Sequence, residues 1–393
     1  MSVADLALQR NKYHHLSDAE WRWFLQQVEG RERTADKLPT FAAINDWWYP
    51  VRLSCEQCSS ELTARYKTAI IANSQKLTAN SLSTMVDLTG GYGVDTFFLS
   101  EQFAHTDYVE QNAELCRIAE HNKGLWVTGD GVREISVHNS TAEDFLKTAG
   151  LYDLIFLDPA RRDSHGGKVF RLEDCTPNVV ELLPTLLQHL TPEGRLMLKL
   201  SPMLDITQAM KELSVVSLQW SVHIVAVKNE VKELLLLSGG SGQITAIDLS
   251  KKEQAFTFTR EEEQRAGMVN GKCKNGKWLY EPNAAILKAG AYKLVAQRFG
   301  LQKLDVNTHL YVSDTLVENF PGRIWKVKEP TPSLPEGKEK NQQANVLTRN
   351  YPLTPEQLKK KMRLRDGGED YLIGARVDGK PTLFWAQRWT TND

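Results

Sequence analysis

The chain has 393 residues, of which 41% are hydrophobic and 25% charged, and its formal net charge at pH 7 is −1. This composition is typical of a folded, water-soluble protein, and the length is that of two or three domains. The N-terminus lacks the apolar run of a signal peptide, and no stretch approaches the roughly 20 apolar residues that span a bilayer. We therefore expect a cytoplasmic protein with no membrane partner. Nothing in the sequence indicates an oligomeric state.

The five cysteines are odd in number and scattered, unlike the paired cysteines of a small secreted domain. Cys55 and Cys58 have the C-x-x-C spacing of zinc ligands, but no second pair follows at a finger-like distance. A structural zinc site needs four ligands. We expect two thiols on an ordinary helix and no metal site.

Residues 1–80 are expected to form a helical region. Ser17 to Glu20 show a capping-box pattern, followed at the spacing of one helical face by Trp21, Phe24, Leu25 and Val28. A second helix is predicted from about Ser59 to Asn73, with one side formed by Leu62, Tyr66, Ala69, Ile70 and Asn73. The pair Trp47–Trp48 between them is expected to pack between helices, with a base-stacking surface as the alternative.

From Thr84 onward, short β-rich runs alternate with helical runs, which is typical of parallel βαβ units. The predicted strands are Met85–Leu88, Tyr108–Val109, Ile135–Val137, Leu154–Leu157, Arg195–Leu200, Val222–Val227 and Glu233–Leu237. Only Lys228 to Lys232 connect the last two strands, too few residues for a crossover helix, so this pair must be antiparallel. We predict an α/β domain over residues 81–240.

Polar residues follow three of these strands. The first strand runs into the glycine-rich segment Val86–Gly93 (VDLTGGYG), where the backbone can approach a nucleoside closely. Glu110 ends the second strand, 23 residues after Asp87, where an acid can accept the ribose hydroxyls of an adenosine-bearing cofactor. Asp158-Pro159-Ala160-Arg161 ends the fourth strand and faces the same crevice. A dinucleotide site is the alternative, but its G-x-G-x-x-G pattern would require glycine at position 96, which is Thr96.

From Leu82 to Gly240 the sequence resembles the class I S-adenosylmethionine-dependent methyltransferases. The loop Asp87–Gly93 looks like the first motif of that family, with Thr89 in place of the usual first glycine. The resemblance implies a Rossmann-like domain that binds S-adenosyl-L-methionine. Its cofactor-binding residues would be Asp87, Thr89, Gly91 and Gly93 near the methionine part, Glu110 at the ribose, and the backbone of Ala142 at the adenine.

The C-terminal part is predicted to be a further series of short elements. Strands are expected at Ile244–Leu249, Ala255–Thr259, Lys277–Tyr280 and Thr308–Val312, and one helical run at Asn283–Phe299. A linker rich in lysine and proline is expected at Glu329–Gln343. The chain should close with the strand Asn345–Arg349, the helix Pro355–Met362 and the strands Asp370–Val377 and Leu383–Gln387.

Segments such as Tyr280–Ile286 (YEPNAAI), Phe320–Arg323 (FPGR) and Leu364–Leu372 (LRDGGEDYL) are similar to those of a bacterial family. In that family a methyltransferase domain carries a ferredoxin-like segment and a C-terminal THUMP-like domain. The resemblance implies a β-rich bridge at 241–279, a ferredoxin-like segment at 280–328 and a small α+β THUMP-like domain at 329–393. THUMP domains accompany enzymes that modify RNA, so it also implies an RNA partner.

Local charge agrees with an RNA partner. From Pro321 to Arg365 there are eleven Lys or Arg residues against four Glu, a local charge of +7 that leaves −8 for the rest of the chain. The run Lys359–Arg365 (KKKMRLR) is expected to span two helical turns and to contact phosphates of tRNA or rRNA. A solvated helix face is the alternative.

Asp158, Pro159 and Arg161 are the predicted catalytic residues. In methyltransferases that modify amino groups, an Asp/Asn-Pro-Pro-aromatic loop orients the amine and stacks the base. Here Ala160 and Arg161 replace the second proline and the aromatic residue. Arg161 could hold a substrate phosphate, or form an ion pair with Glu173 or Asp174.

Enzymes that methylate uridine at C5 require a cysteine nucleophile. Cys175 is a candidate for that role, but we expect it to be an ordinary small residue. The sequence thus predicts an S-adenosylmethionine-dependent enzyme that methylates an RNA base. The alternatives are a methyltransferase acting on a protein or small molecule, and a non-catalytic RNA-binding protein that keeps the fold. The N-terminal helices could cover the cofactor cleft.

Overall fold

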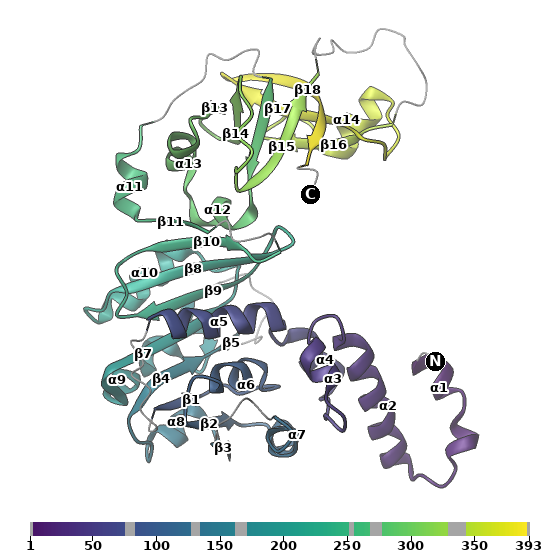
Figure 1. The fold of residues 1–393 in the computed structure, drawn as a ribbon, viewed down its shortest axis with the longest axis vertical. Coiled ribbons are helices and arrows are strands. Elements are labelled where there is room, and N and C mark those ends of the chain that lie inside the picture. Colours follow the sequence, from purple (N-terminus) through teal and green to yellow (C-terminus); the bar gives the residue numbers. More distant parts are fainter. Residues whose placement is uncertain are drawn as a thin grey trace. The chain divides into compact units, whose positions relative to one another are not determined.

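The structure is a computed structural model that describes residues 3–74, 83–126, 134–161, 171–250, 255–267, 277–328 and 343–390. The chain divides into two compact units (Figure 1): Met1–Trp220 with Leu234–Ser241, and Ser221–Glu233 with Gly242–Asp393. Within the described ranges, no helix is both long and apolar enough to cross a membrane.

Unit 1 begins with a helical region, as predicted. Its elements are α1 (Val3–Ala7), the 3-10 helix η1 (Arg10–Tyr13), α2 (Asp18–Thr34), α3 (Pro39–Ala43), α4 (Arg52–Gln57) and α5 (Glu61–Ser74). The capping box is confirmed, because the Ser17 hydroxyl accepts from the Glu20 N–H and the Glu20 carboxylate accepts from the Ser17 N–H. Ser17 thus satisfies a backbone donor that the first turn of α2 would leave unpaired.

The alternating segment of unit 1 forms the predicted strands and the helices between them. The strands are β1 (Thr84–Asp87), β2 (His105–Glu110), β3 (Glu134–Asn139), β4 (Tyr152–Leu157) and β7 (Leu190–Leu200). The short strands β5 (Ala160–Arg161) and β6 (Cys175–Thr176) pair with each other. The helices are α6 (Val94–Ser100), α7 (Ala113–Lys123), α8 (Ala142–Leu146), α9 (Val179–Gln188) and α10 (Ile206–Glu212), with the 3-10 helices η2 (Leu172–Asp174) and η3 (Leu213–Val215).

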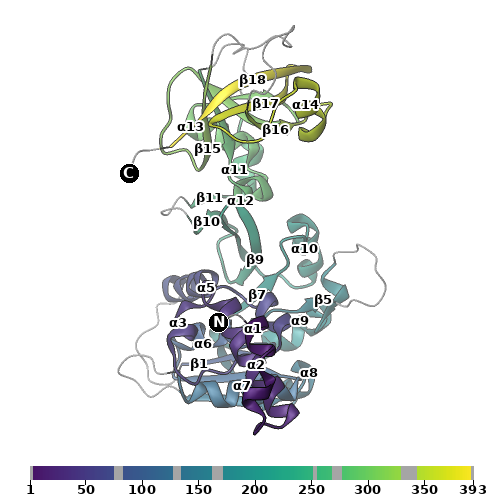
Figure 2. The same ribbon diagram turned by 90° about the vertical axis from the view of Figure 1, so that its right-hand side faces the viewer.

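These strands form a mostly parallel sheet in the order β9-β7-β4-β1-β2-β3. Strands β1 to β4 and β7 run parallel, and the Leu234–Leu237 part of β9 (Glu230–Ser238) pairs antiparallel with β7. Helices α5 and α6 lie on one side of the strands and α9 and α10 on the other (Figure 2). Because parallel strands end at the same edge, Asp87, Glu110 and Asp158 come together there. The predicted Rossmann-like α/β fold is confirmed.

The N-terminal helices share one hydrophobic core with this sheet domain. Phe41 and Trp47 are buried against Phe97 and Phe98 of α6, with ring centroids of Phe41 and Trp47 4.3 Å apart. Trp48 stacks on His121 of α7 at 3.7 Å. The tryptophan pair therefore packs between elements, as predicted.

Helix α5 buries a different face from the one predicted. Leu62 is 49% exposed, and Ala69 and Asn73 are also exposed. The buried side instead consists of Thr63, Ala64, Lys67, Thr68, Ile70 and Ile71. The prediction failed because apolar periodicity disfavours a buried lysine, whereas the buried Lys67 has an ion-pair partner.

In unit 2, β8 (Trp220–Val227) is followed after two residues by β9, and the two strands are neighbours in the sheet. Lys228 and Asn229 both have positive φ, of 53° and 62°, as a tight two-residue hairpin turn requires. Strand β10 (Ile244–Asp248) pairs parallel with β8 and antiparallel with β11 (Phe256–Phe258). The short helix α11 (Arg260–Arg265) follows.

A second sheet occupies the rest of unit 2, in the order β13-β14-β12-β15-β18-β17-β16. Its strands are β12 (Trp278–Pro282), β13 (Gln302–Asp305), β14 (Thr308–Ser313), β15 (Gly322–Val327), β16 (Asn345–Arg349), β17 (Asp370–Val377) and β18 (Lys380–Trp389). Helix α14 (Pro355–Met362) packs Leu358 and Met362 against Leu372 of β17. The THUMP-like region is therefore α+β, as expected.

Three details of unit 2 differ from the prediction. The helical run at 283–299 is two helices, α12 (Ala284–Ala289) and α13 (Tyr292–Phe299), because Gly290 ends the first at φ +78°. Strands β13 and β15 were not predicted. The basic run does not continue as helix, since α14 ends at Met362 and Arg363 has a left-handed conformation. Most of the predicted linker 329–343 lies outside the described residues.

Candidate active site

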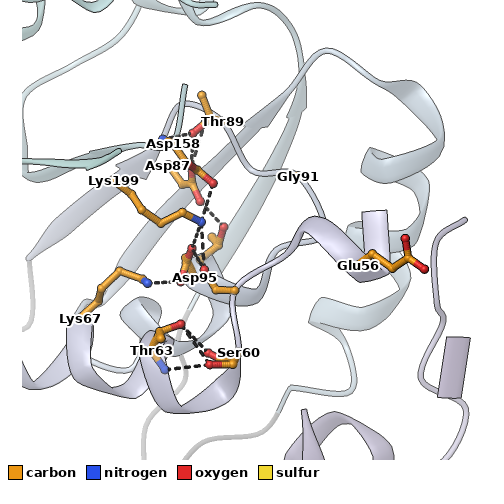
Figure 3. Close-up of polar contacts among 12 residues, drawn as sticks. Glu56, Ser60, Thr63, Lys67, Asp87, Thr89, Gly91, Asp95, Asp158 and Lys199 are labelled. Atoms are coloured by element: carbon orange, nitrogen blue, oxygen red, sulfur yellow. Dashed lines mark hydrogen bonds and ion pairs between the residues drawn. The ribbon is translucent and has the colours of Figure 1, made fainter. Parts of the chain in front are cut away.

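A cleft of about 350 Å³ opens in unit 1 at the carboxyl ends of the parallel strands. All six predicted cofactor-binding residues line it: Asp87, Thr89, Gly91, Gly93, Glu110 and Ala142. Asp158, the first of the predicted catalytic residues, lies in its wall, and Figure 3 shows it close to Asp87 and Thr89. Ser54, Gln57, Cys58 and Ser59 also line the cleft, so the N-terminal region forms one wall of it.

The glycine-rich loop is shaped by contacts within the protein. A Cβ added to Gly90 would lie 2.2 Å from the Tyr108 ring, and one added to Gly93 would lie 2.8 Å from the Phe97 ring. Gly91 and Gly93 have φ of +55° and +83°, a region that residues with a Cβ rarely adopt. Beside Gly91 the nearest atom to an added Cβ is 3.7 Å away, so this side of the loop is open.

The loop also orients Glu110. One carboxylate oxygen accepts from the Gly91 N–H at 2.9 Å and the other from the Asn112 N–H at 2.8 Å. Each oxygen keeps a lone pair that can accept from a ligand hydroxyl. Nearby, the Thr141 hydroxyl accepts from the Asp144 N–H and thereby caps α8, whose first residue is Ala142.

Asp87 is 1% exposed at the end of β1. Its carboxylate accepts from the Thr89 N–H at 2.9 Å and from the Thr96 hydroxyl at 2.5 Å. Burial raises the pKa of Asp87 to about 7, and these hydrogen bonds only partly oppose the shift. Thr96, the residue that replaces the third glycine of a dinucleotide site, therefore holds the loop carboxylate.

Thr89 links the loop to the predicted catalytic segment. Its hydroxyl donates to Asp87 at 3.3 Å and accepts from the backbone N–H of Asp158 at 2.7 Å. A glycine here, as in the usual family motif, could make neither side-chain hydrogen bond. Thr89 thus sets the position of Asp158 relative to Asp87.

Asp158 also belongs to a chain of buried charges that the sequence did not reveal (Figure 3). The Lys199 ammonium lies 2.5 Å from Asp158 Oδ2 and 3.1 Å from Asp95 Oδ2, and the Lys67 ammonium lies 3.1 Å from Asp95 Oδ1. The side chains of Lys67, Asp95 and Lys199 are at most 11% exposed, whereas that of Asp158 is 39% exposed. Asp158 is therefore the cleft end of a paired charge network.

The electrostatics of this network favour its charged form. Burial alone would raise the pKa of Asp95, but the ammonium groups of Lys199 and Lys67 outweigh burial and hold that pKa below its usual value. The Ser59 hydroxyl donates to Asp95 at 2.6 Å and accepts from Lys199 at 2.9 Å. Ser59 thereby ties the segment before α5 to the strand ends.

The remaining predicted catalytic residues follow Asp158 in the chain. Pro159 is half-buried, and Arg161 belongs to β5, with a side chain outside the described part. Glu173 forms an ion pair with Arg171 at 2.8 Å. Cys175 is 3% exposed, and its thiol contacts the Arg171 carbonyl at 3.7 Å. No disulfide joins the cysteines of the described ranges, and no group of three or more His, Cys, Asp or Glu within them could hold a metal.

The whole chain resembles a solved structure. A protein from Porphyromonas gingivalis W83, named as a methyltransferase without a stated substrate, is 32% identical, with a TM-score of 0.83 over 95% of this chain and 92% of that one. This chain belongs to that methyltransferase family. Two proteins from strains of Mycobacterium tuberculosis, each named an uncharacterized S-adenosylmethionine-dependent methyltransferase, are 22% identical over 87% of this chain and 89% of their own length.

Two family matches lie in the C-terminal part of the methyltransferase. Residues 278–321 match a ferredoxin-like domain and residues 322–388 match a family described as THUMP domain-like. The resemblance inferred from the sequence is thereby confirmed. The protein is an S-adenosylmethionine-dependent methyltransferase.

The cleft of the methyltransferase has the hydrogen-bond acceptors that this cofactor needs. S-adenosylmethionine carries ribose hydroxyls, a cationic amino group and a cationic sulfonium, and when bound it supplies an electrophilic methyl group. Glu110 offers an oriented carboxylate to hydroxyls, and Asp87 is a second carboxylate in the same cleft. The residues present therefore fit the cofactor.

Sequence reasoning missed Lys67, Asp95 and Lys199 in the methyltransferase site. A weak signal for Lys67 exists, since it shares a helical face with Ala64 and Ile71, and an unexplained lysine on an apolar face suggests a buried partner. Asp95 and Lys199 give no comparable signal, because they meet only through the pairing of distant strands and helices.

Proposed function

We propose that this methyltransferase modifies a base of RNA, either tRNA or rRNA. The observation that carries the proposal is the THUMP domain-like region at 322–388, in the same chain as a cleft with the acid Asp158 in its wall. The exposed basic residues of that region, Lys360, Lys361, Arg363 and Arg365, support it because they can contact phosphates.

We assign the cofactor to the cleft of unit 1. Asp87, Thr89, Gly91 and Gly93 surround its methionine part, Glu110 accepts from the ribose hydroxyls, and the backbone of Ala142 faces the adenine. Support for this assignment comes from the open side of Gly91 and from the two hydrogen bonds that orient Glu110.

In this proposal Asp158 accepts a hydrogen bond from the amine that receives the methyl group. Lys199 and the Thr89 hydroxyl hold the Asp158 side chain and backbone from two sides, so the acceptor is aligned with little motion. The carbonyl of Pro159 is a second acceptor for the amine, and we assign to Arg161 the binding of a substrate phosphate.

One observation favours the alternative acceptor, a protein or small molecule. The aromatic residues that line the cleft, Tyr92 and Phe156, are 5% and 1% exposed, so neither offers a face for a flipped base among the described lining. An acceptor that needs no stacking would fit this lining as well as a base does.

Transfer of labelled methyl from S-adenosylmethionine separates these acceptors. The full-length protein is incubated with total RNA, protein extract or small-molecule extract from cells that lack it, and each reaction is divided into RNase-treated and protease-treated portions. The variant Asp158→Ala tests whether methyl transfer requires the Asp158 carboxylate. Asp36→Ala is the matched control, because Asp36 is exposed in unit 1 and lies outside the cleft lining.

We expect label in RNA that is lost with RNase and with Asp158→Ala, and retained with Asp36→Ala. Label that resists RNase and disappears with protease would support a protein acceptor. Binding of the cofactor without transfer to any fraction would contradict the proposal.

A further inference from the structure

The second sheet of unit 2 curls so that β16, at one end, approaches β12 and β14 of the other half. Arg349 at the end of β16 donates to the Glu281 carboxylate on β12, and Asn350 lies 3.3 Å from the Thr308 hydroxyl on β14. The apolar cluster that includes Leu279, Trp325 and Ile373 lies inside this curve. Edge strand β16 is thus partly covered by strands of the other half of the sheet.

A polar cavity of about 500 Å³ opens beside this core. Its lining includes Arg323 and Trp325 of β15, Asn345 of β16, Asp366, Tyr371 of β17 and Arg388 of β18. We call it the Arg388 pocket. Its volume lies within the range of ligand sites, and its polar lining points to a charged ligand.

Arg388 is the unusual residue of this pocket. It stands opposite Trp325 in the β15–β18 register, with its guanidinium 5.2 Å from the indole centroid. Burial lowers the pKa of Arg388, and the neighbouring Arg323 lowers it further. Among the residues that the structure describes, no carboxylate lies within ion-pair distance of its guanidinium. A half-buried cation without an ion-pair partner costs free energy that a bound anion would recover.

The carboxylates near the pocket are already engaged. Glu281, 5% exposed, lies 3.6 Å from Arg323 and also accepts from Arg349. Asp366 forms a 2.6 Å ion pair with Lys359. The guanidinium groups of Arg323 and Arg349 therefore share one buried carboxylate, and Arg388 pairs with no carboxylate of the described residues, so the pocket keeps an excess of positive charge.

We propose that the Arg388 pocket binds a phosphate group of single-stranded RNA. A guanidinium pair matches the oxygens of a phosphate in a bidentate geometry. The exposed Arg363 and Arg365 lie directly before Asp366 in the chain and continue the positive charge away from the pocket, as a backbone with a phosphate at every nucleotide requires. The choice of RNA rests on the proposed function.

The test uses the full-length protein and a fluorescent ten-nucleotide RNA, with inorganic phosphate and a phosphoserine peptide as separate competitors. Arg388→Met keeps an aliphatic stem over Trp325 and removes the charge. Arg388→Lys keeps the charge and removes the planar fork. Arg376→Met is the matched control, because Arg376 lies on β17, is absent from the pocket lining, and among the described residues donates to the Gly379 carbonyl alone.

We expect Arg388→Met to weaken RNA binding about tenfold and to reduce the salt slope by about 0.7, as when one phosphate is no longer neutralised. The RNA affinity of Arg388→Lys should lie between those of Arg388→Met and the wild type. Inorganic phosphate should compete with the RNA, and Arg376→Met should bind RNA normally. Thermal unfolding is measured for each variant. If Arg388→Met is destabilised, the RNA affinity of Arg388→Lys is compared with that of the wild type instead.

Wild-type affinity in both Arg388 variants, or equal losses in Arg376→Met, would overturn the proposal. Stronger competition by the phosphopeptide than by RNA would overturn the choice of RNA. Methyl transfer is measured in parallel. Labelled RNA with normal binding by the Arg388 variants would refute only this pocket, whereas Arg388-dependent binding without methylated RNA would refute only the proposed function.

Discussion

The backbone N–H of Asp158 donates to the Thr89 hydroxyl at 2.7 Å, which joins the acid at the end of β4 to the loop that follows β1. Thr89→Val keeps the shape of the side chain and removes this acceptor. We expect it to lower the free energy of unfolding by about 1 kcal/mol, because a partly buried donor loses its partner. We also expect kcat to fall about tenfold or more, since Asp158 loses its alignment.

Steady-state kinetics and urea unfolding check this prediction, with Thr89→Ser expected to restore most of both losses. Thr106→Val is the control for removal of a threonine hydroxyl, because the buried Thr106 hydroxyl has no hydrogen-bond partner in the described part of the chain. It should leave stability unchanged or improved. If Thr89→Val behaves like Thr106→Val, the hydroxyl does not position Asp158.

Substitutions within the Lys67–Asp95–Lys199 network should have non-additive effects on the free energy of unfolding. Lys67→Met leaves Asp95 with one of its two ammonium partners, and we expect it to lower the free energy of unfolding by about 3–5 kcal/mol. The double variant Lys67→Met with Asp95→Asn should cost less than the sum of the two single changes.

Urea unfolding of the four proteins of this cycle measures the coupling. The matched control is Lys147→Met, which removes a lysine from an exposed pair with Asp144 and should leave the unfolding midpoint unchanged. Strict additivity of the Lys67 and Asp95 changes would contradict the network.

Cofactor binding should depend on pH through Asp87. Because burial raises its pKa to about 7, Asp87 is mostly protonated at pH 6 and mostly ionised at pH 8. An ionised carboxylate attracts the cationic methionine part, so affinity for S-adenosylmethionine should be about tenfold higher at pH 8 than at pH 6. Calorimetric titration at both pH values measures the difference, and Asp87→Asn should remove it.

The raised pKa of Asp87 makes folding stability fall with rising pH, whereas cofactor affinity should increase. A raised pKa means that the folded chain without cofactor binds the proton more tightly than the unfolded chain. The contribution of Asp87 to stability is therefore fully present below about pH 4 and is lost as the pH rises toward 7. Asp87→Asn should unfold with less dependence on pH in this window, and an unchanged pH profile would show that Asp87 is ionised throughout.

The elements that the sequence predicted well are those with a local cause. The strand ends at Asp87, Glu110 and Asp158 follow from apolar runs that alternate with helical spacing, and the parallel order then brings the three acids to one edge. The Lys228–Asn229 turn was also predictable, since so short a connection permits only a hairpin.

The elements that the sequence missed depend on tertiary partners. The buried face of α5 is set by the ion pair of Lys67 with Asp95, and no periodicity in the helix itself shows that partner. Strand β15 was missed because its charged Arg323 and Lys326 interrupt the apolar pattern, yet neighbours cover both sides of the strand. Distant pairing overrides local composition in both cases.

Salt dependence separates an RNA-binding surface from a solvated helix end. Lys360 and Lys361 of α14 are exposed, and neither forms an ion pair with a carboxylate of the described residues, so both are available for phosphates. Charge reversal of both, Lys360→Glu with Lys361→Glu, should weaken RNA binding. It should also reduce the slope of log affinity against log salt by about 0.7 for each phosphate that the helix no longer neutralises.

The control for this charge reversal is a second double variant with the same change of net charge. In Lys12→Glu with Lys211→Glu, this change of charge is placed at exposed sites in unit 1. Fluorescence anisotropy between about 50 and 200 mM salt compares the two variants, because counterion release changes affinity steeply over that range. Equal slopes of log affinity against log salt in both double variants would mean that RNA binding depends only on net charge. Helix α14 would then be a solvated surface.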